Sequence, residues 1–271
     1  MVARLVVGSF GIVAFPPQRN DMKDSPSRRD APLGEHDAGS FTWTPEWWQD
    51  WTEKDHGTRS YVLSTITESA LMLLKPSPGD LVLNVGCGYG REAKALLHRF
   101  PTARIIGIDA STSMIVDAKN NLPNRFDAAQ GSASELPFDD NTFDHILCIG
   151  VLMHVRDEFP ACREMIRVLR PGGRLIVSFN SVLHPLGFAV QHLLSHRKRN
   201  IPGYKQIFRL PHAYTGFLRK LGCRVRLHPG TFALGNEPAA LLRALRYADR
   251  YLAAIIPWAT FEPILQCEKR S

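Results

Sequence analysis

Paired cysteines are lacking from this sequence. Its five cysteines, Cys87, Cys148, Cys162, Cys223 and Cys267, stand singly, without a C-x-x-C pair and without a metal-ligand spacing to histidine. This pattern argues against a disulfide framework and against a zinc site, and we expect no bound metal. Isolated thiols are typical of a reducing compartment, so we expect a cytoplasmic protein.

The sequence also lacks an apolar run long enough to cross a membrane. The segment 1–15 is apolar except for Arg4, but it is shorter than the roughly 20 residues that a membrane-spanning helix needs and a pair of prolines ends it. It resembles a secretory signal only in having a charge before an apolar run. We expect residues 1–40 to be a disordered or mis-annotated leader, with Met22 as an alternative start.

Acidic residues are scarce in the last third of the chain. The whole chain has a formal net charge of +7, but residues 181–271 contain 14 Lys or Arg and only 4 Asp or Glu, a net charge of +10, which leaves −3 for residues 1–180. A basic surface suits an anionic substrate, an acidic lipid surface or nucleic acid. Solvated surface arginines are the alternative interpretation.

Glycines are concentrated after a short apolar run. Leu81–Val85 predicts a parallel strand that is buried on both faces. Gly86, Gly88 and Gly90 follow at alternate positions, and Arg91–Phe100 has the apolar spacing of a helix. Glycine is needed where the backbone has a positive φ or where a ligand approaches the main chain, and a helix N-terminus favours electron-rich groups. This strand, turn and helix predict a site for a nucleotide-like ligand.

The glycine spacing differs from that of dinucleotide-binding proteins. The G-x-G-x-x-G pattern requires a glycine where this chain has Arg91. A second apolar strand, Arg104–Ile108, is followed by Asp109, whose carboxylate can accept hydrogen bonds from both hydroxyls of a ribose. Because ligands bind at the carboxyl edge of an open parallel sheet, we expect Asp109 and the glycine turn to lie together there.

Four successive motifs carry a family resemblance. VGCGYG, GIDAS, GSASELPFDDNTFDHILCIGVLMHV and RVLRPGGRLIVSF resemble, in order and spacing, the motifs of the class I S-adenosylmethionine (SAM)-dependent methyltransferases, in the small-molecule branch typified by ubiquinone-biosynthesis-like enzymes. The resemblance covers residues 80–180. It implies an α/β fold, namely a Rossmann-like, doubly wound, seven-stranded and mostly parallel sheet with helices on both faces, an antiparallel last strand, and helical insertions after strand five.

The resemblance implies SAM as the cofactor and assigns residues to its site. In this family's layout the glycines admit the amino-acid end of SAM, the acid after the second strand binds the ribose, and the loop after the third strand frames the adenine. The implied cofactor-binding residues are Asn84, Gly86, Gly88, Gly90, Asp109, Ala110, Met114, Ser132, Ala133 and Ile149.

The sequence departs from the family pattern at two of these positions. Asn84 and Ser132 stand where family members often carry an acid, so we expect hydrogen bonding with reduced charge at the first and adenine recognition shared with backbone groups at the second. Met114 is expected to contact the adenine or the ribose, and core packing is the alternative.

His154 is the candidate catalytic residue. Imidazole titrates close to neutral pH, so His154 can take a proton from an acceptor hydroxyl or amine as the methyl group is transferred. A histidine that only closes its loop is the alternative. Cys148 lacks the preceding proline of a cytosine-C5 nucleophile, and an NPPY-like or DPPY-like motif is absent, so we expect Cys148 to be a buried strand residue.

The expected organisation has four parts. Residues 1–40 are the leader, 41–75 an N-terminal helical lid segment, 76–180 the SAM-binding core, and 181–271 the C-terminal part of the sheet with basic, substrate-binding helical insertions. Trp43, Trp47, Trp48 and Trp51 lie close together in the lid segment, where they either pack against the body of the protein or cover the substrate.

The most favoured function is transfer of a methyl group from SAM to a small-molecule acceptor, such as a lipid, a sugar or a natural product, by in-line SN2 displacement. One alternative is an RNA methyltransferase that binds phosphates with the basic C-terminal third. Another is a SAM-binding, non-catalytic partner protein. A third is a lipid-associated enzyme, because the helix predicted over 238–256 carries Arg243, Arg246 and Arg250 on one face and would contact an anionic membrane peripherally.

Overall fold

The structure is a computed structural model of the 271-residue chain. It describes residues 7–8, 11–12, 58–122, 126–155, 157–184, 207–232, 248–249 and 251–270. The tryptophan-rich part of the expected lid, the insertion expected after strand five, and the three arginines of the helix predicted over 238–256 lie outside the described residues.

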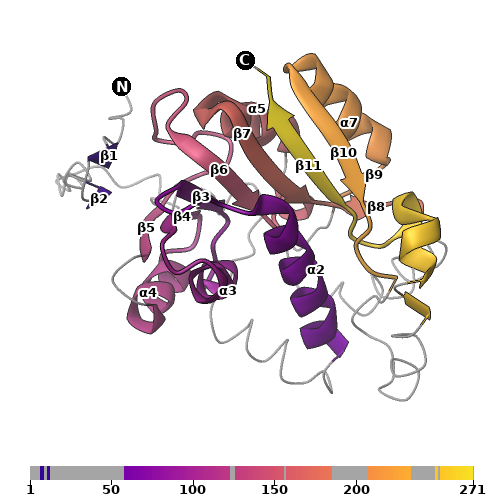
Figure 1. Cartoon of the computed structure of the whole chain (residues 1–271), viewed down its shortest axis with the longest axis horizontal. Helices are drawn as coiled ribbons and strands as arrows, with labels where there is room; N and C mark the ends of the chain where they lie inside the picture. Colours follow the sequence, from indigo (N-terminus) through magenta and orange to yellow (C-terminus); the bar gives the residue numbers. More distant parts are fainter. Residues whose placement is uncertain are drawn as a thin grey trace, which may run out of the picture.

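A seven-stranded sheet forms the centre of the molecule (Figure 1), with the strand order β10-β11-β7-β6-β3-β4-β5. Strand β11 pairs antiparallel with both of its neighbours, and the pairs from β7 through β5 are all parallel. The strands are β3 (Leu81–Val85), β4 (Arg104–Asp109), β5 (Phe126–Gln130), β6 (Phe143–Cys148), β7 (Leu169–Ser178), β10 (Cys223–His228) and β11 (Ile264–Lys269). The predicted seven-stranded, mostly parallel sheet with an antiparallel last strand is confirmed, and the predicted helical insertions after strand five stay a prediction.

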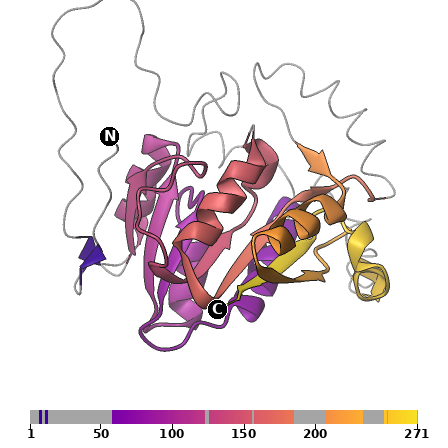
Figure 2. The ribbon, with the colours of Figure 1, turned by 90° about the horizontal axis from the view of Figure 1, so that it is seen from above.

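Helices cover both faces of the sheet, as Figure 2 shows from above. On one face α2 (Thr58–Leu74), α3 (Arg91–Arg99) and α4 (Thr112–Asn121) contribute to one buried apolar cluster. On the other, α5 (Glu158–Val168) and α7 (Pro211–Lys220) contribute to a second. Because both faces are covered, the central strands are mostly apolar, and all five residues of β3 are buried, including the polar Asn84. No helix in the described part of the chain is long and apolar enough to cross a membrane.

Several short elements lie outside the large sheet. Val7–Gly8 (β1) pairs antiparallel with Gly11–Ile12 (β2), and Asn180–Ser181 (β8) pairs parallel with Phe208–Arg209 (β9). Two 3₁₀ turns follow the ends of longer elements: η1 (Leu152–His154) and η2 (Pro257–Ala259). Residues 248–249 and 251–255 are helical.

The sequence predicts a strand over Arg174–Phe179, after a turn at 171–173, and a last strand over Phe261–Glu268. The structure differs from the prediction at both strands. Strand β11 begins at Ile264 rather than at Phe261, because the Phe261 N–H donates to the Thr231 carbonyl instead of to the sheet and Pro263 has no N–H to donate. Strand β7 begins at Leu169, before the predicted turn, because Leu169 already pairs with Phe143 and the register shifts between Phe143 and His145.

Phe143 anchors the second apolar cluster, and its replacement should destabilise the protein. Its ring is fully buried and packs edge-on against Phe138, with ring centroids 4.8 Å apart. We expect Phe143→Ala to lower the free energy of unfolding by about 3–5 kcal/mol, measured by chemical denaturation. Val116→Ala, at an exposed position of α4, should change it by less than about 0.5 kcal/mol. Equal effects of the two substitutions would show that the Phe143 ring is not a core contact.

Candidate functional site

The three glycines of the turn between β3 and α3 all have positive φ, but they have different neighbours. A Cβ at Gly86 would lie 2.2 Å from Val151 Cγ2, and one at Gly90 would lie 2.3 Å from Leu122 Cδ1. A Cβ at Gly88, where φ is +50°, would meet no atom within 4 Å. Packing therefore requires glycine at Gly86 and Gly90, whereas Gly88 borders open space that a ligand can enter.

The Asp109 carboxylate lies against this turn. Asp109 is the last residue of β4. Its Oδ2 accepts a hydrogen bond of 2.7 Å from the Gly88 N–H, and its Oδ1 accepts one of 2.9 Å from the Ser111 N–H. Burial raises the pKa of Asp109 above its ordinary value, against the opposing effect of the backbone N–H groups of Ser111, Gly88 and Ala110. Each carboxylate oxygen has a second acceptor position, so the pair of hydroxyls of a ribose fits here.

Two side chains near the turn carry buried donor atoms that have no partner. Asn84 is 2% exposed, and its Nδ2 makes no hydrogen bond. At the start of α3, Arg91 donates through Nε to Glu92 Oε1 at 2.7 Å, and its Nη1 is left unpaired. A buried donor without a partner costs about 1–3 kcal/mol. Unpaired N–H donors of this kind fit a carboxylate, such as that of the amino-acid end of SAM.

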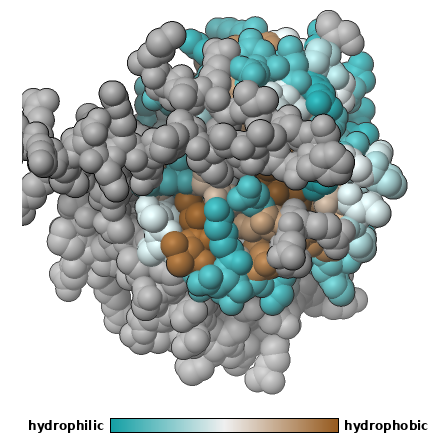
Figure 3. All heavy atoms as spheres, turned by 90° about the vertical axis from the view of Figure 1, so that its left-hand side faces the viewer, coloured by the Kyte–Doolittle hydropathy of each residue, from teal (hydrophilic) through white to brown (hydrophobic). Residues whose placement is uncertain are grey.

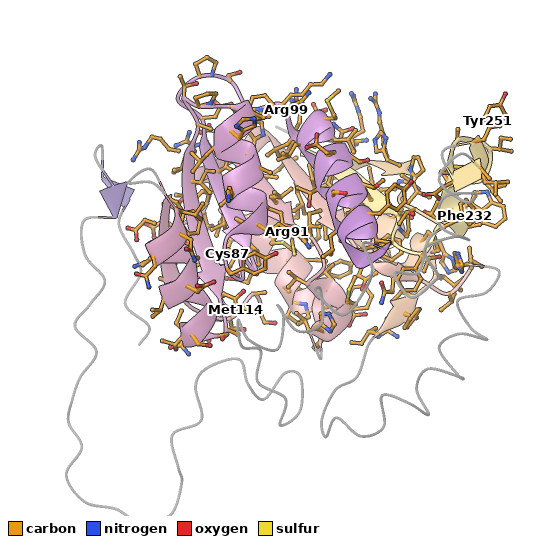
Figure 4. All side chains as sticks on the ribbon, turned by 90° about the horizontal axis from the view of Figure 1, so that it is seen from below. Cys87, Arg91, Arg99, Met114, Phe232 and Tyr251 are labelled. Atoms are coloured by element: carbon orange, nitrogen blue, oxygen red, sulfur yellow. The ribbon has the colours of Figure 1, made fainter. Side chains whose placement is uncertain are left out.

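Figure 4 shows Arg91, Cys87 and Met114 close to one another in that view. Met114 lies in the first turn of α4, where its N–H donates to the Oγ of Ser111, the N-cap residue, and its side chain is buried. The carbonyl of Ala110 accepts from Gln130 Nε2 at 3.1 Å. These contacts hold the segment after β4 beside the carboxyl end of β5.

Ser132 and Ala133 follow the carboxyl end of β5 and are both half-buried. The Ser132 Oγ accepts a hydrogen bond of 3.2 Å from the Ser134 N–H, and Ser132 forms an isolated bridge with Glu135. The hydroxyl at this position therefore shapes its own loop. The loop stands at the same edge of the sheet as the glycine turn and Asp109.

A buried polar chain supports the end of β6. Ile149 is buried there, and the N–H of the next residue, Gly150, donates to Ser178 Oγ at 2.8 Å. The Ser178 hydroxyl in turn donates to Glu262 Oε1 at 2.6 Å. Burial raises the pKa of Glu262 to about 7, although the hydrogen bond from Ser178 and the positive charge of Arg91 act in the opposite direction.

His154 lies directly beyond the carboxyl end of β6, at the last position of η1, and is half-buried. Its backbone N–H donates to the Val151 carbonyl at 2.8 Å, and the neighbouring Met153 carbonyl accepts from the Ile207 N–H at 2.7 Å. The turn is thus held in place between β6 and the β8–β9 pair. Cys148 is fully buried, and burial raises the pKa of its thiol well above its ordinary value, so it stays a thiol.

Asn180 is a second buried amide without partners. It follows the carboxyl end of β7, is 1% exposed, and neither its Nδ2 nor its Oδ1 makes a hydrogen bond. A buried side chain that offers one donor and one acceptor can bind a group that carries both. Asn180 stands two residues after Ser178, at the edge of the sheet that carries the glycine turn.

Four residues of this edge were not predicted as site residues: Arg91, Ser178, Asn180 and Glu262. Arg91 had a visible signal, because it occupies the position where a dinucleotide site has glycine. Glu262 had none, since it joins Ser178 from a segment 84 residues away in the sequence. Among the described residues no group of three or more His, Cys, Asp or Glu side chains is arranged to hold a metal ion.

Three features together define the nucleoside-binding core of class I methyltransferases. They are the strand order, the open glycine turn after the first strand, and a carboxylate at the end of the second strand. The chain carries such a domain, since residues 83–177 match the family described as "Methyltransferase domain". The curated proteins that the chain resembles include demethylmenaquinone methyltransferases, which agrees with the predicted resemblance to the ubiquinone-biosynthesis-like, small-molecule branch. SAM is the cofactor of this domain, and the open turn, Asp109 and the unpaired donors fit it.

Individual relatives support the same family. The chain is 30% identical over 144 residues to "O-methyltransferase cnsE" from Penicillium expansum, which covers 51% of each protein. It is 28% identical over 183 residues to a demethylmenaquinone methyltransferase from Bacillus cereus, which covers 65% of this chain and 76% of that one. The chain spans about half the length of most of the curated relatives that it matches.

The fold is also found among solved structures. A SAM-dependent methyltransferase from Thermotoga maritima superposes with a TM-score of 0.61 at 19% identity, and the match covers 83% of this chain and 95% of that one. At this level of identity the likeness concerns the fold alone.

A matched pair of substitutions can test whether SAM occupies the open space beside Gly88. Gly88 and Gly172 both have positive φ and open space at the Cβ position, but Gly172 lies in the first half of β7, away from its carboxyl end. Both alanine variants should lose a similar stability, about 1–2 kcal/mol. Only Gly88→Ala should weaken SAM binding, by about tenfold or more, measured by isothermal titration calorimetry. Equal affinities of the two variants would place the cofactor elsewhere.

The pH dependence of stability provides a test of the Glu262 environment. The folded-state pKa of about 7 lies above the ordinary value of 4.5, so the native state favours the protonated carboxyl. Its contribution is therefore fully present below pH 4.5 and is lost as the pH rises to about 7. We expect the free energy of unfolding of Glu262→Gln to fall less than that of the wild type between pH 4.5 and about 7. Glu268→Gln, at an exposed position of β11, the strand that follows Glu262, should keep the wild-type slope. An identical slope in all three proteins would contradict the prediction.

Proposed function

We propose that this chain transfers a methyl group from SAM to a small-molecule acceptor by in-line displacement. The observation that carries the proposal is the contact between the Asp109 carboxylate and the Gly88 N–H, because it holds a ribose-binding acid against an open glycine turn. The methyltransferase domain and the small-molecule enzymes among the relatives agree with it.

In this proposal the residues predicted from the sequence retain their roles. Asp109 binds the ribose, the segments of Ala110 with Met114 and of Ser132 with Ala133 frame the adenine, and Ile149 contributes to the pocket for the methyl donor. Arg91 and Asn84 bind the amino-acid end, since both carry unpaired buried donors.

When bound, SAM supplies an electrophilic methyl carbon, so the protein needs little covalent chemistry of its own. Its residues hold donor and acceptor in line and exclude water, and such positioning can supply about 7–11 kcal/mol of the barrier. The chain from Gly150 through Ser178 to Glu262 keeps the backbone after β6 in place. Asn180 contacts a polar group of the acceptor, and His154 takes the proton that the acceptor releases.

The nature of the acceptor and the location of the protein belong to the same proposal. The net charge of +10 in residues 181–271 favours an anionic or lipid-like acceptor. We place substrate selection in the lid segment 41–75 and the C-terminal part 181–271, around the SAM-binding core 76–180. All five cysteines are free and buried, as expected of a protein in the reducing cytoplasm.

Product formation is the direct test. The full chain is incubated with methyl-labelled SAM and a metabolite extract, and products are identified by mass spectrometry; a labelled small molecule is expected with the wild type and not with Gly88→Ala. Labelled RNA as the product would replace the small-molecule proposal. Calorimetric binding of SAM without any labelled product would favour a non-catalytic partner protein, and absence of both would refute the assignment.

His154 is tested with the acceptor that this screen identifies. We expect His154→Gln to lower kcat by about 100-fold and to remove the dependence of kcat on pH near the titration of imidazole, while SAM affinity in calorimetry stays unchanged. A kcat within a factor of about two of the wild type would assign His154 to loop closure alone.

A further inference from the structure

Glu262 is a buried acid, and no cation of the described residues lies within ion-pair distance of it. It is 7% exposed and accepts a hydrogen bond of 2.6 Å from the Ser178 hydroxyl. Charged side chains usually lie at the surface, as hydrophilic residues do on the side of the molecule that Figure 3 shows. Burial of an acid without a cation is costly, so the structure around Glu262 must compensate or a ligand must do so.

The backbone places Glu262 opposite Asn180. Strands β7 and β11 are in antiparallel register up to the pair of Ser178 and Ile264. Two backbone hydrogen bonds continue this register: from the Phe179 N–H to the Pro263 carbonyl and from the Ser181 N–H to the Phe261 carbonyl. Opposed residues of an antiparallel pair point to the same face, with Cβ atoms about 4.5–5.5 Å apart. The unpaired amide of Asn180 therefore lies beside the Glu262 carboxyl group.

The face to which Glu262 points is the one that α2, α3 and α4 cover. Side chains two residues apart in a strand share a face. Ile264, two residues after Glu262, belongs to the buried cluster of those helices, and so does Val82, two residues before Asn84. Asn84 and Glu262 thus point to the same face, at the carboxyl edge of the parallel strands.

Arg91, at the start of α3, is the cation nearest in effect to Glu262. Its guanidinium pairs with Glu92, and its Nη1 is buried without a partner. Burial is the largest influence on the pKa values of Arg91 and Glu262, but the charge of Glu262 also raises the pKa of Arg91, and the charge of Arg91 lowers that of Glu262. The two groups are therefore neighbours, although no ion pair joins them.

This arrangement is complementary to an α-amino-acid zwitterion. Such a group carries a carboxylate and an ammonium on one carbon atom, so it fits a cation and an anion that lie near each other. Arg91 offers an unpaired N–H to the carboxylate. The Glu262 carboxylate has acceptor positions beyond the one that Ser178 uses, and they suit an ammonium group. SAM carries this zwitterion at its amino-acid end.

The same placement bears on the departure from the family pattern at Asn84. Family members often carry an acid at that position, whereas this chain has an amide. Glu262 returns a carboxyl group to the same face of the sheet from a segment near the other end of the chain.

We propose that Glu262 binds the α-ammonium group of SAM, while Arg91 binds the carboxylate of the same amino-acid end. Glu262 then supplies the charge that position 84 lacks. The proposal rests on the SAM site of the proposed function, but it does not depend on transfer of the methyl group.

Calorimetry of the full chain with two nucleosides tests this role. S-adenosylhomocysteine carries the amino-acid end, and 5′-methylthioadenosine is a thioadenosine without it. At pH 8, above the pKa of about 7 of Glu262, Glu262→Gln should bind S-adenosylhomocysteine about tenfold or more weakly. Its affinity for 5′-methylthioadenosine should stay within a factor of about two of the wild type, because this ligand has no ammonium group.

Glu158→Gln is the matched control. Glu158 is also a buried acid, but it belongs to α5 on the other face of the sheet and pairs with Arg209 at 2.5 Å. Both nucleosides should bind this variant as they bind the wild type.

Two results with Glu262→Gln refute the proposal. One is an unchanged affinity for S-adenosylhomocysteine. The other is an equal loss for both nucleosides, which would show that Glu262 only supports the backbone of the pocket. If Glu262→Gln does not fold by circular dichroism, Ser178→Ala replaces it, because the Ser178 hydroxyl orients the carboxyl group. An unchanged ratio of the two dissociation constants in Ser178→Ala then counts against the proposal.

Failure of this proposal and failure of the proposed function give different results. Binding that depends on Glu262 as expected, without a methylated product in the labelled extract, supports the ammonium site and refutes the methyl transfer. A methylated product from Glu262→Gln that binds S-adenosylhomocysteine like the wild type supports the transfer and refutes the ammonium site. A wild type that binds neither nucleoside refutes both.

Discussion

The hydrogen bond between the Asp109 carboxylate and the Gly88 N–H is the contact on which the site depends. It joins the end of β4 to the turn after β3 and holds an acceptor group beside the one glycine of the turn that borders open space. Burial makes this carboxylate costly to ionise, and the backbone N–H groups that surround it offset part of that cost. A ligand that donates hydroxyls to the same oxygens would stabilise the charged form further.

Several buried polar groups at the edge of the sheet around this contact have no hydrogen-bond partner within the protein. Asn84, Arg91 and Asn180 have buried atoms without partners, whereas the chain from Gly150 through Ser178 to Glu262 is complete. Unpaired buried polar groups reduce stability, so their concentration at a ligand edge is expected where binding supplies the missing hydrogen bonds. The complete series of hydrogen bonds holds the backbone at Gly150, directly after β6.

Much of the central fold could be predicted because local sequence patterns mark its helices and strands. The sequence predicts strands over 81–85, 126–130 and 223–228 and a helix over 112–121, and β3, β5, β10 and α4 have these limits. The start of β11 was missed because the Phe261 N–H bonds to Thr231, a partner that no local pattern reveals. The roles assigned to the ten cofactor-binding residues and to His154 stay predictions.

By itself, the sequence determined the order of the strands along the chain, the glycine turn and the acid after the second strand, because each is encoded by residues close together. Only the tertiary structure decided that Glu262 meets Ser178 and that Asn180 is buried without a partner. These are contacts or burials set by segments far apart in the chain. Their energies depend on packing, which neither composition nor periodicity specifies.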